Sequence, residues 1–348
     1  MKIAQVAPLH ESVPPPRYGG TERIVSYLTE ELVLRGHDVT LFASGDSRTR
    51  ARLVPSCARA LRMDGCRDPL AMHFRMLEEV AAAAREFDVV HFHVDYLHFP
   101  MTRRLRLPHL TTLHGRLDLP EIAGLYETYR EMPVVSISDA QRTPVPRLNW
   151  RGTVYHGLPA DLYRFSPQPG RYLAFLGRLS PEKRCDRAIE IARRAGLPLK
   201  IAGKVDASDR EYFRSAVEPL LGKDVEFVGE IGDEGKSDFL GGALALLFPI
   251  DWPEPFGLVM VESFACGTPV VAWRHGSVPE IMEEGVTGYV VDTLDEAVRA
   301  VRRAAGIDRR GCRRVFDARF TVPRMLSDYL SLYEAAASRS KRWKKSSA

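Results

Sequence analysis

Two glutamates stand eight positions apart in the stretch Glu254 to Ala272, EPFGLVMVESFACGTPVVA. The stretch follows the apolar run ALALLFP, and helical character starts near Gly257. Glu254 is therefore expected in a strand-to-helix loop and Glu262 about one turn into the helix. Ligands of open α/β sheets bind at such carboxyl ends of strands. A carboxylate there accepts hydrogen bonds from two neighbouring hydroxyls of a ribose or hexose. The ordinary interpretation of an arbitrary E-x7-E pair is a helix-dipole role and a solvated loop acid.

Two cations follow another apolar run, in Phe175 to Lys183, FLGRLSPEK. Ser180 suits the N-cap of a helix and Pro181 its first position. A helix N-terminus attracts phosphate, and Arg178 and Lys183 beside it would stabilise the charge of a departing diphosphate. The alternative is a pair of solvated surface cations.

A glycine pair in Arg17 to Gly20, RYGG, precedes the helical stretch TERIVSYL. Gly19 and Gly20 would let the backbone approach a ligand without an intervening Cβ, and the following helix would add its dipole. A simple turn is the competing interpretation.

Histidine ends the apolar run LTTLH at position 114. His114 would hydrogen-bond a sugar hydroxyl or assist proton movement near pH 7, although a lone histidine is more often structural. A structural role is favoured for His91 and His93 in VVHFHVD. Ser277 to Glu280, SVPE, indicates a capping box, and Gly276 before it is a candidate backbone contact to a sugar.

The elements that position these residues are short apolar runs alternating with longer amphipathic stretches such as Glu22 to Leu34, which predicts parallel sheets built from βαβ units. The predicted strands are Ile3 to Ala7, Val39 to Ala43, Val89 to Phe92, Leu110 to Leu113, Val134 to Ile137, Thr153 to Tyr155, Tyr172 to Leu176, Leu199 to Ala202, Val225 to Val228, Ala243 to Phe248, Pro269 to Ala272 and Gly288 to Val291. The proline-containing stretch Leu158 to Arg171 interrupts the alternation. We therefore predict two Rossmann-like doubly wound α/β domains, 1–165 and 166–325, and a C-terminal helix with a basic tail, 326–348.

The bulk composition is that of an ordinary globular protein, with 348 residues of which 45% are hydrophobic and 27% charged. No apolar run approaches the roughly 18 residues that span a bilayer, and the N-terminus resembles a first strand more than a signal peptide. A cytoplasmic location is expected. The five scattered cysteines indicate neither a disulfide framework nor a zinc site. The net charge of the chain is +4, and the residues beyond 338 carry five cations and no acid. The rest of the chain is therefore nearly neutral, and its charge gives no reason to expect a nucleic-acid partner.

The E-x7-E block with its PFG turn and ACGTPVV exit resembles the signature of retaining glycosyltransferases of family 4, which have the GT-B fold. The resemblance runs over nearly the whole chain and includes the GR…K and GG motifs. It implies that Glu262 holds the ribose of a nucleotide, and that Glu254 and His114 face the donor sugar. Phe256, Gly257 and Leu258 are expected substrate contacts in the turn. Arg178 and Lys183 would bind the diphosphate, with Gly19 and Gly20 against it.

The resulting hypothesis is a retaining transfer of a hexose from a nucleoside diphosphate sugar, held in a cleft between the domains, to a hydroxyl acceptor. UDP-glucose is the first expectation for the donor, and the acceptor is a glycan, a lipid-linked molecule or a small molecule. The resemblance implies no metal and no other cofactor. A nucleotide-sugar epimerase and a non-catalytic sugar-nucleotide sensor stay open as alternatives. The tail RSKRWKK, Arg339 to Lys345, is either a solvated terminus or a weak contact to an anionic membrane surface.

Overall fold

The structure, a computed structural model, describes residues 1–17 and 19–346, and side chains as far as residue 338. The chain divides into two compact units, Met1–Gly157 with Val322–Ala348, and Leu158–Thr321. The boundary between Gly157 and Leu158 lies at the start of the stretch Leu158 to Arg171, which interrupts the alternation in the sequence. The basic cluster from Arg339 to Lys345 lies outside the described side chains.

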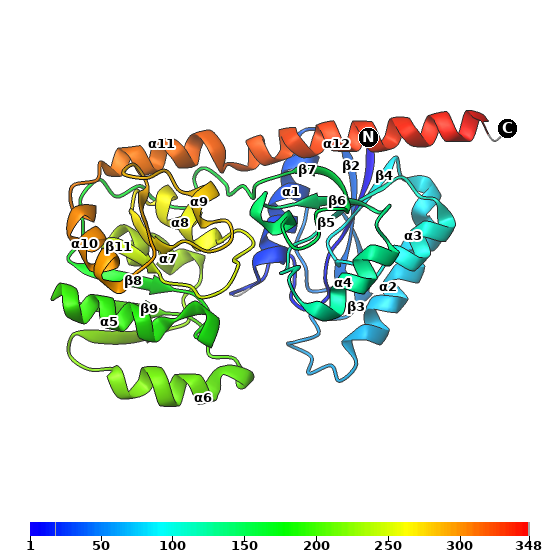
Figure 1. The fold of residues 1–348 in the computed structure, drawn as a ribbon. Helices are drawn as coiled ribbons and strands as arrows, with labels where there is room; N and C mark the ends of the chain where they lie inside the picture. The colour runs from blue at the N-terminus through cyan, green and yellow to red at the C-terminus, as the bar shows by residue number, and fades with distance from the viewer. Residues whose placement is uncertain (18, 347–348) are drawn as a thin grey trace. The chain divides into compact units, whose positions relative to one another are not determined.

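The first unit contains a seven-stranded parallel sheet in the order β3-β2-β1-β4-β5-β6-β7 (Figure 1). Its strands are β1 (Lys2–Val6), β2 (Asp38–Ser44), β3 (Arg52–Cys57), β4 (Val89–Phe92), β5 (His109–Thr112), β6 (Pro133–Ser136) and β7 (Asn149–Thr153). All residues of β4 and β5 are buried, as expected for central strands of a parallel sheet that is covered on both faces.

The helices of the first unit include one from the far end of the chain. They are α1 (Gly20–Leu34), α2 (Pro69–Ala83), α3 (Phe99–Leu105), α4 (Pro120–Thr128) and α12 (Val322–Ser346). α12 contacts α1, β4 and β5 (Figure 1). Its buried tyrosines fix it there, because the hydroxyl of Tyr333 lies 3.0 Å from the amide nitrogen of Gln5 and that of Tyr329 lies 2.9 Å from Thr112 Oγ1. The C-terminal helix therefore completes the first unit.

The second unit has a six-stranded parallel sheet in the order β10-β9-β8-β11-β12-β13. The strands are β8 (Tyr172–Leu176), β9 (Leu199–Ala202), β10 (Val225–Gly229), β11 (Ala243–Phe248), β12 (Val270–Trp273) and β13 (Gly288–Val291), and the helices are α5 (Cys185–Ala195), α6 (Arg210–Tyr212), α7 (Asp233–Gly241), α8 (Leu258–Ala265), α9 (Val278–Ile281), α10 (Leu294–Ala304) and α11 (Arg309–Arg319). α5 and α10 contact each other, whereas α7 and α11 both contact α8 (Figure 1). These two groups of helices make the unit doubly wound, as predicted.

The strand order reverses at the same place in both sheets. The first strand of each unit pairs with the second and the fourth strand of that unit, β1 with β2 and β4, and β8 with β9 and β11. This is the strand order of dinucleotide-binding Rossmann folds, in which ligands bind where the order reverses. The junctions β1/β4 and β8/β11 are therefore the expected ligand positions.

Two edge strands of the first unit differ from the sequence prediction. β3 was missed because Arg52 and Pro55 break its apolar pattern; an edge strand tolerates proline since one side needs no hydrogen bond. The prediction of a strand at Thr153 to Tyr155 was wrong in its bounds, because β7 is the partly exposed segment NWRGT and ends at Thr153.

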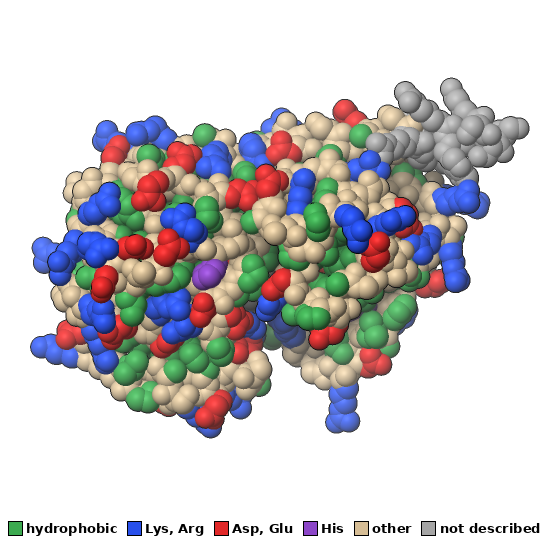
Figure 2. All heavy atoms as spheres, in the orientation of Figure 1, with side chains coloured by type: hydrophobic (Ala, Val, Ile, Leu, Met, Phe, Trp, Pro, Cys, Tyr) green, Lys and Arg blue, Asp and Glu red, His purple; other side chains and the backbone are tan. Residues whose placement is uncertain are grey.

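Charges of both signs are interspersed on the surface of each unit that Figure 2 shows. The five cysteines are free thiols, and all except Cys66 are buried. Among the residues that the structure describes, no helix is both long and apolar enough to cross a bilayer.

Candidate active site

The sheet of the second unit brings Lys183 and Glu254 together. Lys183 closes a short 3-10 turn, Pro181–Lys183, in the loop after β8, and Glu254 lies in the loop after β11. Because β8 and β11 are parallel neighbours, both loops leave the sheet at the same edge, and the Lys183 ammonium contacts Glu254 Oε2 as an ion pair. The pair occupies the β8/β11 junction, where the fold predicts a ligand.

Aromatic rings surround this ion pair. The Lys183 ammonium lies 4.8 Å from the ring centre of Trp252 and 5.5 Å from that of Phe248, and Glu254 is only 8% exposed. A charge that is removed from water requires a partner of opposite charge. Lys183 and Glu254 are such partners for each other. The arrangement holds a lysine and a carboxylate in fixed positions at the end of the sheet.

Arg178 has a different set of partners. Its guanidinium contacts Glu182, its Nε lies 3.6 Å from Asp209 Oδ2 and its Nη1 lies 4.0 Å from Asp206 Oδ2. The predicted cations of the β8 loop thus each have carboxylate partners of their own. Ser180 precedes the turn as predicted, but its side chain makes no capping hydrogen bond, and α5 begins only at Cys185.

Glu262 belongs to a buried cluster that the sequence did not predict. Its Oε1 accepts a hydrogen bond from Lys236 Nζ at 2.8 Å and lies 3.1 Å from the Tyr163 hydroxyl. Lys236 Nζ and the Tyr163 hydroxyl also lie 3.2 and 2.9 Å from Asp233 Oδ1. Asp233 and Lys236 lie at the start of α7, and their separation of three residues, which brings two side chains together on a helix, is the only sign of this cluster in the sequence.

A glycine explains how closely two loops of the site approach each other. Gly276 has a φ of +54°, and a Cβ at this position would lie 2.3 Å from the carbonyl oxygen of Glu254. The neighbouring Ser277 donates its backbone N–H to that carbonyl at 2.9 Å and its hydroxyl to the carbonyl of Phe256 at 2.9 Å. The capping-box prediction for Ser277 to Glu280 was therefore wrong, since the serine side chain holds the loop after β11. Gly257, which precedes α8, also has a left-handed conformation, with a φ of +79°.

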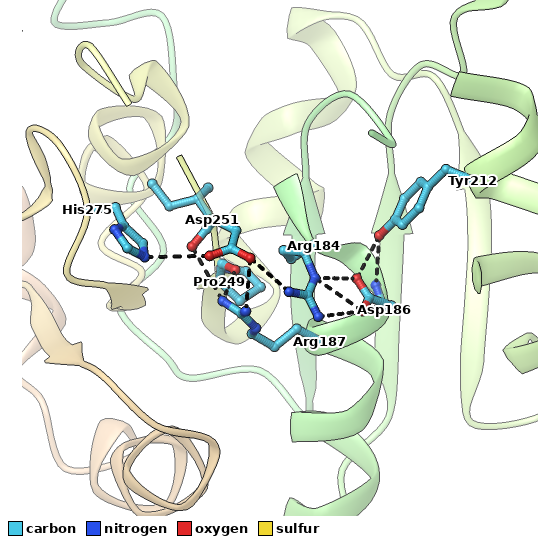
Figure 3. A network of polar contacts seen from close by, with 8 residues as sticks. Arg184, Asp186, Arg187, Tyr212, Pro249, Asp251 and His275 are labelled. Carbon is cyan, nitrogen blue, oxygen red and sulfur yellow. Dashed lines mark hydrogen bonds and ion pairs between the residues drawn. The ribbon is translucent and has the colours of Figure 1, made fainter. Parts of the chain in front are cut away.

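A polar network joins the loops after β8, β11 and β12 (Figure 3). The Nε of Arg184 lies 3.0 Å from Asp186 Oδ1, and its Nη1 lies 2.9 Å from Asp251 Oδ2. The backbone of Arg184 is left-handed, with a φ of 54°. The backbone N–H of Asp251 donates to the carbonyl of Glu182 at 2.8 Å, and His275 Nε2 lies 3.8 Å from Asp251 Oδ1. The network therefore supports the loops that carry Lys183, Glu254 and Gly276.

The glycine loop of the first unit leads into α1 beside a buried acid. Gly19 has a φ of +146°, and a Cβ there would lie 2.8 Å from Pro15 Cγ. Gly20 is the first residue of α1, so the helix begins one residue before the predicted helical stretch TERIVSYL. Glu22 follows it in a buried position, and burial raises the pKa of its carboxyl group to about 7, with a smaller contribution from Glu11.

His114 ends a chain of buried hydrogen bonds at the carboxyl ends of β4 and β5. Its Nε2 lies 2.9 Å from His93 Nδ1, and His93 Nε2 lies 2.8 Å from the amide oxygen of Gln5. His91 bonds Tyr333 at 2.7 Å, so both histidines of VVHFHVD have the structural partners that were expected. Burial lowers the pKa of His114 to about 3, which favours the neutral form of its ring near pH 7.

Within the described residues, no group of three or more His, Cys, Asp or Glu side chains is arranged to hold a metal ion. Charged groups in the second unit are instead compensated by one another, as Lys183 and Glu254 show.

Two Rossmann-like units in one chain, with polar residues gathered where the strand order of each sheet reverses, are the organisation of GT-B glycosyltransferases, and solved structures of that class are similar to this chain. The solved structure of AviGT4, a glycosyltransferase involved in avilamycin A biosynthesis, is similar with a TM-score of 0.75 and 26% sequence identity, and the match covers 97% of this chain and 98% of that one. The chain belongs to glycosyltransferase family 4. The family model described as Glycosyltransferase Family 4 matches residues 18–189, and the one described as Glycosyl transferases group 1 matches residues 164–306.

Characterised relatives extend this similarity over most of the chain. The phosphatidyl-myo-inositol mannosyltransferase of Mycobacterium leprae is 27% identical, with 86% of each chain covered. The GDP-mannose-dependent alpha-(1-6)-phosphatidylinositol dimannoside mannosyltransferase of Mycobacterium tuberculosis is also 27% identical, with 97% of each chain covered. The protein is therefore an enzyme of the glycosyltransferase class.

Proposed function

We propose that this glycosyltransferase moves a hexose from a nucleoside diphosphate sugar to a hydroxyl acceptor with retention of the anomeric configuration. The observation that carries the proposal is the Lys183–Glu254 ion pair at the β8/β11 junction, with Glu262 one helical turn into the helix that follows the Glu254 loop. A cation and two carboxylates there match the needs of a diphosphate, a sugar and a ribose.

Each residue has a distinct part in the proposed transfer. Lys183 and Arg178 stabilise the negative charge that develops on the diphosphate as the bond to the anomeric carbon breaks. Glu254 accepts hydrogen bonds from the sugar while it holds Lys183, and Glu262 accepts those of the ribose hydroxyls. Phe256, Gly257, Leu258 and Gly276 form the loops around the sugar.

His114 takes part in the proposed reaction through its neutral imidazole, and Gly19 and Gly20 take part through their backbone. The acceptor oxygen bonds to the anomeric carbon on the face from which the diphosphate leaves, and the acceptor's proton passes to the departing phosphate oxygen. This front-face course is taken from the family resemblance. No metal ion is required in the proposed reaction, because Arg178 and Lys183 provide the positive charge.

The donor is proposed as UDP-glucose or GDP-mannose. UDP-glucose follows from the resemblance to the family, and GDP-mannose from the name of the Mycobacterium tuberculosis relative. Lipid-linked and glycan hydroxyls are the proposed acceptors, since both mycobacterial relatives are named for mannosyl transfer to phosphatidylinositol compounds.

A donor screen tests this proposal. Release of free nucleotide is measured for a panel of UDP- and GDP-hexoses, with and without hydroxyl acceptors, and the anomeric configuration of the product is read by NMR. Acceptor-dependent release with a retained α-linkage is expected. Conversion of the donor to an epimer without acceptor, or binding without turnover, would contradict it.

A further inference from the structure

Lys236 is a buried cationic partner of Glu262. Its Nζ lies 2.8 Å from Glu262 Oε1 and 3.2 Å from Asp233 Oδ1, and the lysine is 9% exposed while Glu262 is 3% exposed. An ammonium that loses its water at such a position requires compensating acceptors, and the two carboxylates provide them.

Tyr163 completes the arrangement from a third segment of the chain. Its hydroxyl lies 3.1 Å from Glu262 Oε1 and 2.9 Å from Asp233 Oδ1, and the residue is 2% exposed. The tyrosine therefore joins the segment that enters the second unit to the first turn of α7 and to α8. Lys236 and Tyr163 both contact Glu262 at the same oxygen, Oε1.

The contacts with Lys236 and Tyr163 fix the orientation of the Glu262 carboxylate. A carboxylate has two oxygens with about four acceptor positions between them. When a lysine and a tyrosine hold Oε1, the rotation of the carboxylate is fixed, and so is the direction in which its second oxygen points. A fixed carboxylate loses less entropy on binding than a freely rotating one and discriminates better between ligands.

We propose that Lys236 is a positioning residue for ribose recognition, which orients Glu262 so that the site selects nucleoside diphosphates with both ribose hydroxyls over their 2′-deoxy counterparts. The proposal rests on the proposed function, in which Glu262 binds the ribose. Tyr163 has a smaller share in the same task, because a neutral hydroxyl forms a weaker hydrogen bond to a carboxylate than an ammonium does.

A structural role alone predicts a different outcome. If Lys236 only neutralises a buried acid, its removal lowers the stability of the second unit, and the affinities for ribose and deoxyribose nucleotides change together. The ratio between the two affinities therefore separates positioning from simple stabilisation.

The experiment is calorimetry on the full chain with UDP, 2′-deoxy-UDP, GDP and 2′-deoxy-GDP as probes. The wild type is expected to bind the ribonucleotide of its preferred base at least about tenfold more tightly than the deoxynucleotide, the scale of one lost hydrogen bond in a preformed site. In Lys236→Met the ratio is expected to fall to near one, mainly through weaker ribonucleotide binding. Lys236→Arg retains most of it, and Tyr163→Phe shows an intermediate value.

Lys200→Met is the matched control, because Lys200 is a partly exposed lysine of β9 that faces Glu226 at 3.7 Å. It should bind all four nucleotides as the wild type does. A wild-type ratio in folded Lys236→Met overturns the proposal. If Lys236→Met does not fold, the proposal is overturned when Lys236→Gln and Tyr163→Phe both keep the wild-type ratio of ribonucleotide to deoxynucleotide affinity.

Failure of the underlying function would look different. A wild type that binds ribose and deoxyribose nucleotides equally, together with a Glu262→Gln variant of unchanged affinity, would remove Glu262 from the ribose site and overturn both proposals. Loss of discrimination in Glu262→Gln but not in Lys236→Met would leave the function standing and reject only the role of Lys236.

Discussion

Lys183 and Glu254 form an ion pair although 71 positions separate them in the chain. Each lies in a loop beyond the carboxyl end of a strand, and the two strands, β8 and β11, are parallel neighbours at the place where the strand order reverses. The pair is therefore a direct product of the sheet topology.

Removing the cation of this pair should affect the chemical step. Lys183→Ala is expected to lower kcat/KM by about 100-fold, the effect of losing one group that stabilises transition-state charge. Lys183→Arg should recover part of the loss, and Arg178→Ala should show a similar decrease. Steady-state kinetics with the preferred donor gives the values, with Lys200→Ala as control. Wild-type turnover in both alanine variants would show that the two residues are ordinary surface cations.

Gly276 should tolerate no side chain. In Gly276→Ala the new Cβ would meet the backbone of Glu254 at 2.3 Å, so the loop after β11 must move. We expect a loss of roughly 100-fold in kcat/KM, because small displacements of positioned groups cost that much. Gly285→Ala is the matched control, since Gly285 has a φ of +74° but no atom within 4 Å of the added Cβ. Equal activity in the two variants would contradict the importance of this close approach.

Glu22 should make the stability of the first unit depend on pH. Burial raises the pKa of its carboxyl group to about 7 in the folded protein, from 4.5 as the ordinary value. The folded state then binds more protons than the unfolded state between these two pH values, so stability falls as pH rises from about 4.5 to 7.

The isosteric variant Glu22→Gln removes this penalty. Its free energy of unfolding should exceed that of the wild type by on the order of 2 kcal/mol at pH 8, and the difference should vanish near pH 4.5. Urea unfolding at both pH values provides the measurement, with Glu78→Gln, on the exposed face of α2, as control. A difference independent of pH would rule out the titration of Glu22 as its cause.

Tyr333 should contribute to the stability of the first unit through its hydroxyl. Tyr333→Phe leaves the Gln5 amide and His91 Nδ1 without this partner in a buried position, which costs about 1 to 3 kcal/mol. Thermal unfolding of Tyr333→Phe beside Tyr129→Phe, a half-buried tyrosine of the same unit, tests this. An equal, small effect in both would mean that the hydroxyl network adds nothing to stability.

Metal removal should leave the transfer unaffected. Arg178 and Lys183 supply the positive charge in the proposed mechanism, so dialysis against a chelator is expected to leave kcat unchanged. Kinetics before and after dialysis, and again after addition of magnesium or manganese, would reveal a dependence. A loss of activity that a divalent ion restores would require a different account of the diphosphate site.

Much of this protein could be predicted from local patterns in the chain. Continuous apolar runs such as Ala243 to Phe248 predicted central parallel strands, because a strand that is covered on both faces has no polar side. Glu254 and Lys183 could be placed at one edge of a sheet because both follow such runs. The motif around Glu262 indicated the family, and the comparisons agree.

Tertiary structure alone decided which groups became partners. Lys236 and Tyr163 belong to a helix and to a connecting segment, and no local pattern distinguishes them from solvated residues; only the packing of α7 beside α8 buries them against Glu262. Likewise, the sequence indicated a capping serine at position 277, whereas the fold turned its hydroxyl toward Phe256. Periodicity reports how a segment divides between core and solvent, but a hydrogen-bond partner is set by contacts between residues that are distant in the chain.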